Sequence, residues 1–536
     1  MIGNVFSVRA LRNLPGADVD LETALESLVR KELLRPDRQA FAARDGFRFR
    51  HSLVRDAAYG GLSKSTRADL HERFGDWLTG DGAGPGRQYE EIVGYHLEQA
   101  HELRADLGLP DPVLARRGSE QLGIAGRRAA AGGDMPAAAN LLDRAATLLP
   151  REDPERGGLL LDLAESLLDL GESGLANATI GEARRVGEAL KDDQLVARAS
   201  TDAVWLRVRL DPASVREGRA ELGRAIDYFA ANHDDRCLAH ALRVQASLSA
   251  SFELQLGAAQ ELLERALGHA EAAADVPMRT RILSALTSAL FWGPVHASEA
   301  LDRCEEIVER VAGDRRAVAS CRVRIAGLRA MGGDFERARA DLADARTLLE
   351  ELGLPFLHAR TGDVAGLIEL LAEDPERAEA ELRGAAEELA RMGERAYRAT
   401  TVALLARALA AQGRDEEAER WTHEAEDAAV GLDKATEVIA RATRAGLLAR
   451  RGEPVPAEGL ARQAVEAASA SDELRGHADA LWELGGVLRL SGDTEGAATA
   501  FRGAHELYER KGVAPSVERA AAVLANLDQS DASSAR

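Results

Sequence analysis

Small and large apolar residues alternate along this chain with a helical spacing. A small residue is followed four positions later by a larger one, and three positions after that by another small one. Positions i, i+4 and i+7 lie on one face of a helix, and small side chains there let a second helix approach closely. The pattern occurs ten times, as Ala138/Leu142/Ala145, Ala176/Ile180/Ala183, Gly218/Leu222/Ala225, Ala259/Leu263/Ala266, Ala297/Leu301/Cys304, Ala338/Leu342/Ala345, Ala378/Leu382/Ala385, Ala418/Thr422/Ala425, Ala457/Ala461/Ala464 and Ala497/Phe501/Ala504.

The interval between successive triplets is nearly constant, at 38 to 42 residues. A glycine or an acidic residue precedes most triplets, as in Gly333-Asp334 and Gly492-Asp493. Glycine ends a helix in the left-handed conformation, and an acid caps or charges the start of the next helix. Each unit is therefore predicted to be two antiparallel helices, and stacked units are predicted to form an α-solenoid.

This pattern resembles the second helix of tetratricopeptide (TPR) repeats, with a period longer than the usual 34 residues. Residues 480–501, ALWELGGVLRLSGDTEGAATAF, match it best. We expect TPR-like repeats over 132–512, with connecting helices and the start of the array over 89–131. A capping helix and a polar tail are expected over 513–536.

The first eighty residues have a different pattern. Leucines at helical spacing predict a helix over 20–35, closed by Pro36. QAFAAR (39–44) and FRFRH (47–51) flank Asp45-Gly46, a predicted hairpin turn, with Phe47, Phe49 and His51 on one face of the second strand. Two helices, 52–62 and 65–78, follow. The fold class predicted is all-α: a small winged-helix domain (1–79), a flexible linker (80–88) and a TPR-like α-solenoid superhelix.

The N-terminal segments FRFRHSLVRDAAYGGL (47–62), RADLHERFGDWL (67–78) and EEIVGYHLEQAHE (90–102) resemble bacterial STAND-class signalling ATPases. In that family a nucleotide-binding core precedes a winged helix and a TPR array, and some members carry a cyclase or transcription-factor domain. The resemblance implies a nucleotide-sensing position at His51, with Arg55 and Asp56 beside it. A core or interface histidine is the alternative interpretation of His51.

Motifs for catalysis are absent from the sequence. There is no G-x-x-x-x-G-K-[ST] phosphate loop, H-E-x-x-H, G-x-S-x-G or CxxC string. His96, Glu98 and His101 have poor spacing for zinc and are expected to be solvated or interhelical. We therefore predict no enzymatic activity, no cofactor and no metal. Because the resemblance to STAND ATPases comes without their phosphate loop, we also expect the chain to be the C-terminal regulatory part of a larger protein, cut at its start or encoded separately.

Composition narrows the picture further. The net charge of the chain is −21. Residues 1–78 have a net charge of +2, so the rest of the chain is strongly acidic, which argues against broad nucleic-acid binding. A winged-helix DNA-binding regulator, with a basic patch at Arg48, Arg50, Arg55, Lys64 and Arg67, stays open as an alternative. Three scattered cysteines and the lack of a long apolar stretch predict a cytoplasmic protein without a membrane span.

Charge also differs between the helices of a unit. The five predicted first helices between 314 and 491 total +6, and the five second helices between 334 and 511 total −13. Because first helices line the concave surface of TPR-like solenoids, we expect a neutral-to-basic groove that suits a protein or peptide partner with acidic character. An acidic outer wall that is merely solvated is the alternative. The predicted groove residues are Arg322, Arg324, Arg329, Arg398 and Arg444.

The predicted function is regulatory: the array binds a partner and relays that state to a signalling ATPase, a cyclase or a transcription output. A regulatory fragment of a nucleotide-binding STAND ATPase or adenylate cyclase without its catalytic domain is the second hypothesis.

Overall fold

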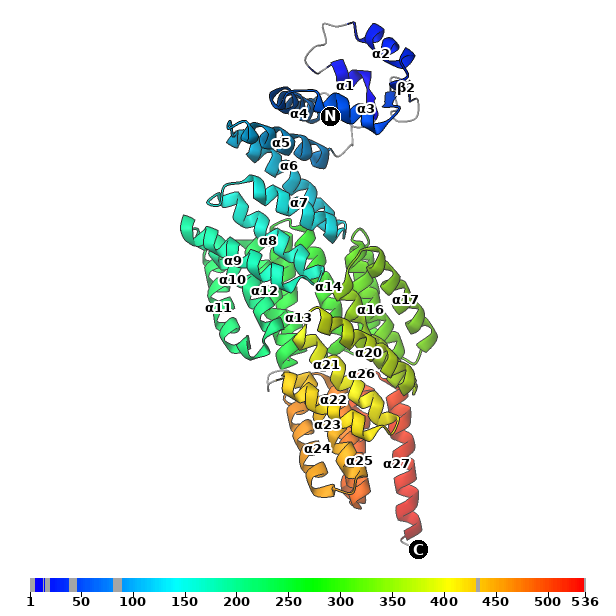
Figure 1. Cartoon of the computed structure of the whole chain (residues 1–536). Coiled ribbons are helices and arrows are strands. Elements are labelled where there is room, and N and C mark those ends of the chain that lie inside the picture. Colours follow the sequence, from blue (N-terminus) through cyan, green and yellow to red (C-terminus); the bar gives the residue numbers. More distant parts are fainter. Residues whose placement is uncertain are drawn as a thin grey trace. The chain divides into compact units, whose positions relative to one another are not determined.

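The structure, a computed structural model, describes residues 5–12, 14, 20–37, 46–80, 89–429 and 434–534. Contacts divide the chain into two compact units. Unit 1 comprises 1–130, 136–163 and 185–191, and unit 2 comprises 131–135, 164–184 and 192–536. Figure 1 labels most of the helices and one strand.

Unit 1 begins with a small sheet and continues with helices. Its elements are β1 (Val5–Ser7), α1 (Val8–Arg12), α2 (Leu21–Arg30), β2 (Leu34–Pro36), β3 (Gly46–Phe49), α3 (Ser52–Gly60), α4 (Lys64–Thr79), α5 (Glu90–Asp106) and α6 (Pro112–Ala131), followed by α7 (Met135–Leu148) and the first part of α8 (Pro154–Asp169). The residues of α8 from Ala164 onward belong to unit 2.

The sheet is antiparallel with the strand order β1-β3-β2. Phe6 lies opposite Phe47, and Leu34 lies opposite Phe49. Phe47 and Phe49 pack on the buried side chains of Phe6, Leu25 and Leu34, which confirms that these two share one face. His51, predicted on the same face, lies beyond the end of the strand and is exposed.

One detail of the sequence prediction for this module is wrong. The helix does not continue to Pro36 but ends at Arg30, and Leu34–Pro36 forms a strand. That strand pairs with β3 in an edge position, where a proline is tolerated. QAFAAR, Asp45 of the predicted turn and the linker residues 81–88 lie outside the described residues.

The rest of the chain consists of helix pairs. They are α9 (Ser173–Leu190), α10 (Asp193–Leu210), the short 3₁₀ helix η1 (Pro212–Ser214), α11 (Val215–Ala231), α12 (Asp235–Glu253), α13 (Leu256–Ala272), α14 (Val276–Trp292), α15 (Ala297–Arg310), α16 (Arg315–Met331), α17 (Phe335–Glu351), α18 (Pro355–Ala359), α19 (Thr361–Leu371), α20 (Pro375–Arg391), α21 (Arg395–Ala411), α22 (Asp415–Ala429), α23 (Lys434–Arg450), α24 (Pro454–Ser469), α25 (Leu474–Ser491), α26 (Thr494–Lys511) and α27 (Ala514–Ser534).

These helices confirm the predicted periodicity. Every residue of the ten triplets is buried except Leu301, which is half-buried. The turn residues Gly333 and Gly492 both have φ of +89°, and the side chains of Asp334 and Asp493 cap the helices that follow. The part of the chain that follows the small sheet-containing module in sequence is thus an all-α TPR-like superhelix. The last helix is longer than expected, because α27 continues through the predicted polar tail to Ser534.

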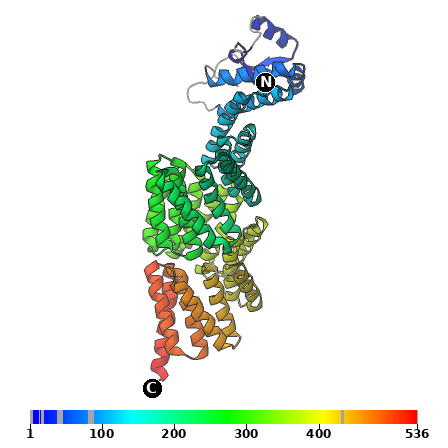
Figure 2. The ribbon, with the colours of Figure 1, turned by 90° about the vertical axis from the view of Figure 1, so that its left-hand side faces the viewer.

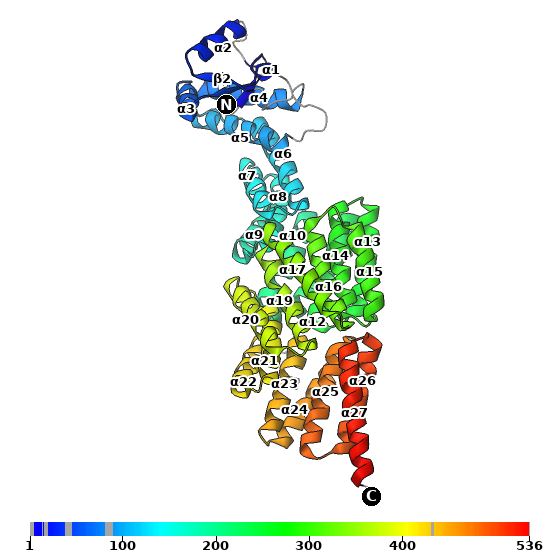
Figure 3. The same ribbon diagram turned by 90° about the vertical axis from the view of Figure 1, so that its right-hand side faces the viewer.

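Successive turns of the superhelix touch inside unit 2. Figures 2 and 3 show the orange-to-red helices directly next to the ends of the green ones. The carboxylate of Asp472 accepts hydrogen bonds from the backbone N–H groups of Leu256 and Gly257, both at 2.7 Å. The buried ammonium of Lys511 donates to the carbonyls of Leu290, Gly293 and Val295 at the end of α14, at 3.2, 2.7 and 2.9 Å. Residues 215 to 221 positions apart are therefore neighbours.

Candidate functional site

A cavity of about 420 Å³ lies inside unit 2. Most of its lining comes from the first helices of the repeat units: α8, α10, α12, α14, α16, α18, α19, α21, α23 and α25. The small residues of each triplet lie on the second helix of a unit and are buried by helix packing. The side chains on the inner face of the first helices therefore determine whether the interior is filled.

Those inward positions are small and polar over long stretches. α12, α14 and α16 present Ser247, Ser284, Ser288 and Ser320 to the cavity, together with several alanines. Large side chains would fill the interior at the packing density of a protein core, whereas these leave it hollow. The aromatic side chains on the wall are Trp205, Trp292, Phe356 and Tyr397. Hydroxyl groups beside aromatic rings are typical of sites that hold an organic ligand.

Charged side chains are numerous on this wall and nearly balanced in sign. It carries seven arginines and eight Asp or Glu residues. Ion pairs join Arg281 to Glu165 and Arg316 to Asp169, both at 2.7 Å. The wall is therefore close to neutral as a whole, and any preference for a charged ligand has to be local.

The strongest charge cluster on the wall surrounds Asp479. Arg407 and Arg475 approach its Oδ2 at 2.6 and 3.0 Å, and the Tyr508 hydroxyl donates to its Oδ1 at 2.5 Å. Burial alone would raise the pKa of Asp479, but the two guanidinium charges outweigh it and hold the pKa well below its usual range. Burial raises the pKa of the neighbouring Glu483 carboxyl.

Three arginines on the wall, Arg243, Arg324 and Arg360, lack a carboxylate partner within ion-pair distance among the described residues, and Arg243 contacts the His240 ring nitrogen Nδ1 at 3.3 Å instead. Arg324 donates from Nε to the Ser288 hydroxyl at 3.1 Å, and its guanidinium carbon lies 5.8 Å from the centre of the Phe291 ring. Arg360 lies over the Tyr397 ring at 4.1 Å and near Phe356 at 5.7 Å. Burial, and then the charge of Arg360, lower the pKa of Arg324 to about 10, so it remains a cation at neutral pH.

The predicted groove residues fall into two groups. Arg324 lines the cavity. The other four make ion pairs with acids of second helices: Arg322 with Asp344 at 3.9 Å, Arg329 with Asp341 at 3.0 Å, Arg398 with Glu424 at 2.5 Å and Arg444 with Glu426 at 3.0 Å. A role for these four in partner binding stays a prediction.

His51 occupies the residue before α3, where its side chain is exposed and caps no backbone group. This exposure contradicts a core position for His51, and the interface position that was the other part of that interpretation stays a prediction. Arg55 and Asp56 pair with each other at 2.5 Å. A nucleotide-sensing role for these three residues stays a prediction from the family resemblance.

The proposed basic patch of unit 1 is largely neutralised. Arg48 pairs with Asp37 at 2.7 Å, Arg50 with Glu32 at 2.9 Å, Arg55 with Asp56, and Lys64 with Asp106 at 2.9 Å. Arg67 lies over the Tyr59 ring at 5.1 Å. DNA phosphates would have to compete with these carboxylates, which disfavours a DNA-binding surface here.

His96, Glu98 and His101 of α5 were expected to be either solvated or between helices, and the structure places them between helices. His96 is buried against His71 of α4. Glu98 is buried and pairs with Arg144 at 2.5 Å. His101 Nδ1 lies 3.0 Å from the carbonyl of Asp111. Among the described residues, no group of three or more His, Cys, Asp or Glu side chains is arranged to hold a metal ion.

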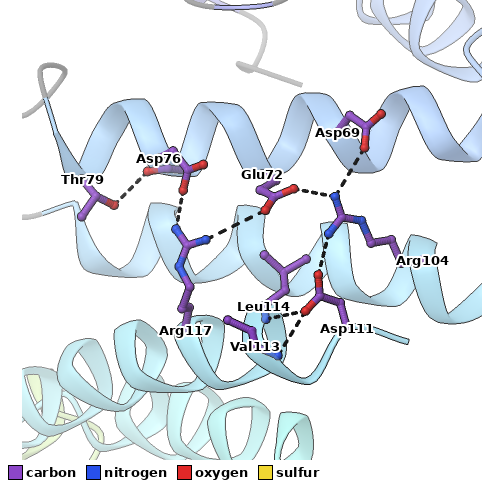
Figure 4. A network of polar contacts seen from close by, with 10 residues as sticks. Asp69, Glu72, Asp76, Thr79, Arg104, Asp111, Val113, Leu114 and Arg117 are labelled. Atoms are coloured by element: carbon purple, nitrogen blue, oxygen red, sulfur yellow. Dashed lines mark hydrogen bonds and ion pairs between the residues drawn. The ribbon is translucent and has the colours of Figure 1, made fainter. Parts of the chain in front are cut away.

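A polar network holds α4, α5 and α6 together in unit 1 (Figure 4). Arg104 of α5 contacts Asp69, Glu72 and Asp111 at 3.4, 2.5 and 2.7 Å. Arg117 of α6 reaches Glu72 and Asp76 of α4. These side chains pair with one another, and the network is a structural feature of the module and not a ligand site.

Sequence reasoning missed the cavity and Arg360. A local signal existed in the repeated serines on the inward faces of α12, α14 and α16, where a buried core would have large apolar residues.

None of the described helices combines the length and the apolar character that crossing a membrane requires.

No family model and no curated protein sequence matches this chain. Among solved structures, a Rap protein complexed with competence and sporulation factor is 13% identical with a TM-score of 0.53, over 68% of this chain and 100% of that one. Yeast Tom70 is 15% identical, with a TM-score of 0.34, over 87% and 99%. A STAND protein with a tetratricopeptide repeat sensor from Pyrococcus horikoshii is 13% identical, with a TM-score of 0.35, over 86% and 60%. The first likeness, together with the ten buried triplets, identifies the fold as a TPR-like superhelix.

Proposed function

We propose that this protein is a non-enzymatic regulatory scaffold whose superhelix binds a peptide or an extended segment of a protein partner inside the cavity of unit 2. The single observation that carries the proposal is the hollow, polar and aromatic interior, which the inward-facing side chains of the first helices create. A hollow interior lined by hydroxyls and rings contributes little to stability, but it supplies hydrogen-bond partners and stacking surfaces to an extended chain.

Two further points support a proteinaceous partner. TPR-like superhelices are built to present a continuous inner surface over many repeats. The Rap protein with the similar fold was solved in complex with competence and sporulation factor. The sheet-containing module in unit 1, which we propose to be a winged helix, would relay the bound state to a signalling ATPase, a cyclase or a transcription output, as the resemblance to STAND proteins suggests.

The experiment is a fluorescence-polarisation titration of the full chain with a pool of fluorescein-labelled random hexapeptides. We expect a subset of the pool to bind. Ser320→Trp fills the cavity from α16 and should weaken these binders at least tenfold, whereas Ala343→Trp adds the same bulk on the exposed face of α17 and should not. Failure of every peptide to bind, or equal effects of both variants, would contradict the proposal.

A further inference from the structure

We propose that Arg324 and Arg360 form a subsite of the cavity that binds a carboxylate group of the peptide partner. The inference rests on the proposed function, and it adds the chemistry that the ligand must carry. Both residues line the cavity, one from α16 and the other from the junction of α18 and α19.

The first argument is the missing counter-charge. Arg281, Arg316, Arg407 and Arg475 on the same wall each have a carboxylate oxygen within 3.0 Å, but no described carboxylate lies within ion-pair distance of the other three lining arginines. Of these three, Arg243 contacts the His240 ring nitrogen Nδ1 at 3.3 Å, whereas Arg324 and Arg360 have no such ring nitrogen beside them. A guanidinium group removed from bulk water needs hydrogen-bond acceptors with negative charge. An anionic ligand supplies what the protein wall does not.

The second argument is that both guanidinium groups are held in place. The Nε of Arg324 is tied to the Ser288 hydroxyl, so its terminal N–H groups remain to be used. Arg360 lies over the Tyr397 ring, which fixes the plane of the guanidinium and leaves its edge available for hydrogen bonds. Such fixed forks match the two oxygens of a carboxylate and lose little freedom when they bind it.

The third argument concerns the charge of the ligand. Asp363 lines the same stretch of wall, and its Oδ1 accepts a hydrogen bond from the Thr401 hydroxyl at 2.7 Å. Two guanidinium groups and one carboxylate leave a single net positive charge. That matches a carboxylate with one negative charge better than a phosphate monoester, which carries between one and a half and two near neutral pH.

A carboxylate can come from the C-terminus of the partner or from an Asp or Glu side chain. Each hexapeptide that binds the wild-type chain is therefore tested in three forms: with a free C-terminus, with an amidated C-terminus, and with Asp and Glu replaced by Asn and Gln. We expect one of the two modified forms to bind at least tenfold more weakly than the free acid. The form that loses affinity identifies the source of the carboxylate.

The protein variants are Arg324→Gln, Arg360→Gln and the control Arg322→Gln. Arg322 lies two residues from Arg324 on the same helix, but it is exposed and pairs with Asp344. We expect each cavity variant to weaken the free-acid peptides at least tenfold and to bind the modified form almost as the wild type does, while Arg322→Gln leaves affinity unchanged. Arg324→Lys, which keeps the charge but not the fork, should fall between these results.

Failures of the two proposals are distinguishable. Peptides that bind the wild type and are insensitive to Arg324→Gln, to Arg360→Gln and to loss of their carboxylates overturn the subsite and leave the peptide-binding cavity intact. A wild-type chain that binds no peptide overturns both. Thermal melting of each variant checks its folding, and Arg360→Gln provides the test if Arg324→Gln is unstable, because Arg360 makes no side-chain hydrogen bond or ion pair with any described residue.

Discussion

The Nδ1 atoms of His71 and His96 lie 2.8 Å apart, so the two buried rings share one N–H between them. The Tyr59 hydroxyl lies 2.9 Å from the other nitrogen of His71. Burial lowers the pKa of His71 to about 4 and that of His96 to about 3. The hydrogen-bonded series Tyr59–His71–His96 therefore holds both imidazole rings in their neutral form, and it links α3, α4 and α5 of unit 1.

Lowering the pH should destabilise this part of unit 1. The unfolded histidines take up protons near pH 6.5, whereas the folded pair stays neutral until about pH 4, so the stabilisation is fully present above 6.5 and decreases below it. Between pH 6.5 and 5 the expected loss in the free energy of unfolding is at most about 2 kcal/mol for each ring. Hydrogen exchange of the α4 and α5 amides, corrected for the intrinsic rate, measures it.

Two glutamine variants separate this effect from general acid sensitivity. His71→Gln/His96→Gln keeps polar groups at the helix interface but removes the titration, and should flatten the dependence over this pH range. His101→Gln on the same helix should keep the wild-type dependence. A double variant as sensitive to pH as the wild type would show that other groups are responsible.

Close helix contact in the repeats predicts opposite effects for two Gly→Ala substitutions. A Cβ at Gly362 of α19 would lie 2.2 Å from the Cβ of Ala385, the last small residue of its triplet, whereas a Cβ at Gly384 of α20 meets no atom within 4 Å. Gly362→Ala should destabilise unit 2 by roughly 1–3 kcal/mol through overpacking. Gly384→Ala should stabilise it by up to about 1 kcal/mol through helix propensity. Urea unfolding measures both, and a stable Gly362→Ala would contradict the close approach.

The contact between superhelical turns is tested at Asp472. Its carboxylate serves as a remote cap for α13, since the side chain of Gln255 at the start of that helix makes no cap. Asp472→Ala should cost about 1–2 kcal/mol and speed hydrogen exchange in the first turn of α13. Asp493→Ala removes a cap of the same kind, but one local to α26, and should leave α13 unchanged. Unaltered exchange in α13 after Asp472→Ala would mean that the turns do not support each other.

The repeat architecture was predictable because its determinants are local. Triplets such as Ala418/Thr422/Ala425 and turn glycines such as Gly333 report the helix pair in which they lie. The cavity was not predictable in the same way, since it depends on neighbours more than two hundred positions apart, as with Asp472 and Leu256. A charge tally along a helix also cannot separate Arg324, which lines the cavity, from Arg322, which pairs on the outside. The strand β2 was missed because Pro36 was interpreted as the residue that closes a helix and not as an edge-strand residue.

Photo-crosslinking tests the central claim, that ligands bind inside the superhelix, most directly. A hexapeptide from the binding pool, carrying a benzophenone group, is irradiated with the full chain, and the attachment sites are read by mass spectrometry. We predict crosslinks to inward-facing residues such as Trp205, Ser247, Ser320 and Tyr397. Attachment confined to the exposed acidic faces of second helices such as α17 and α22, or to α3, would contradict it.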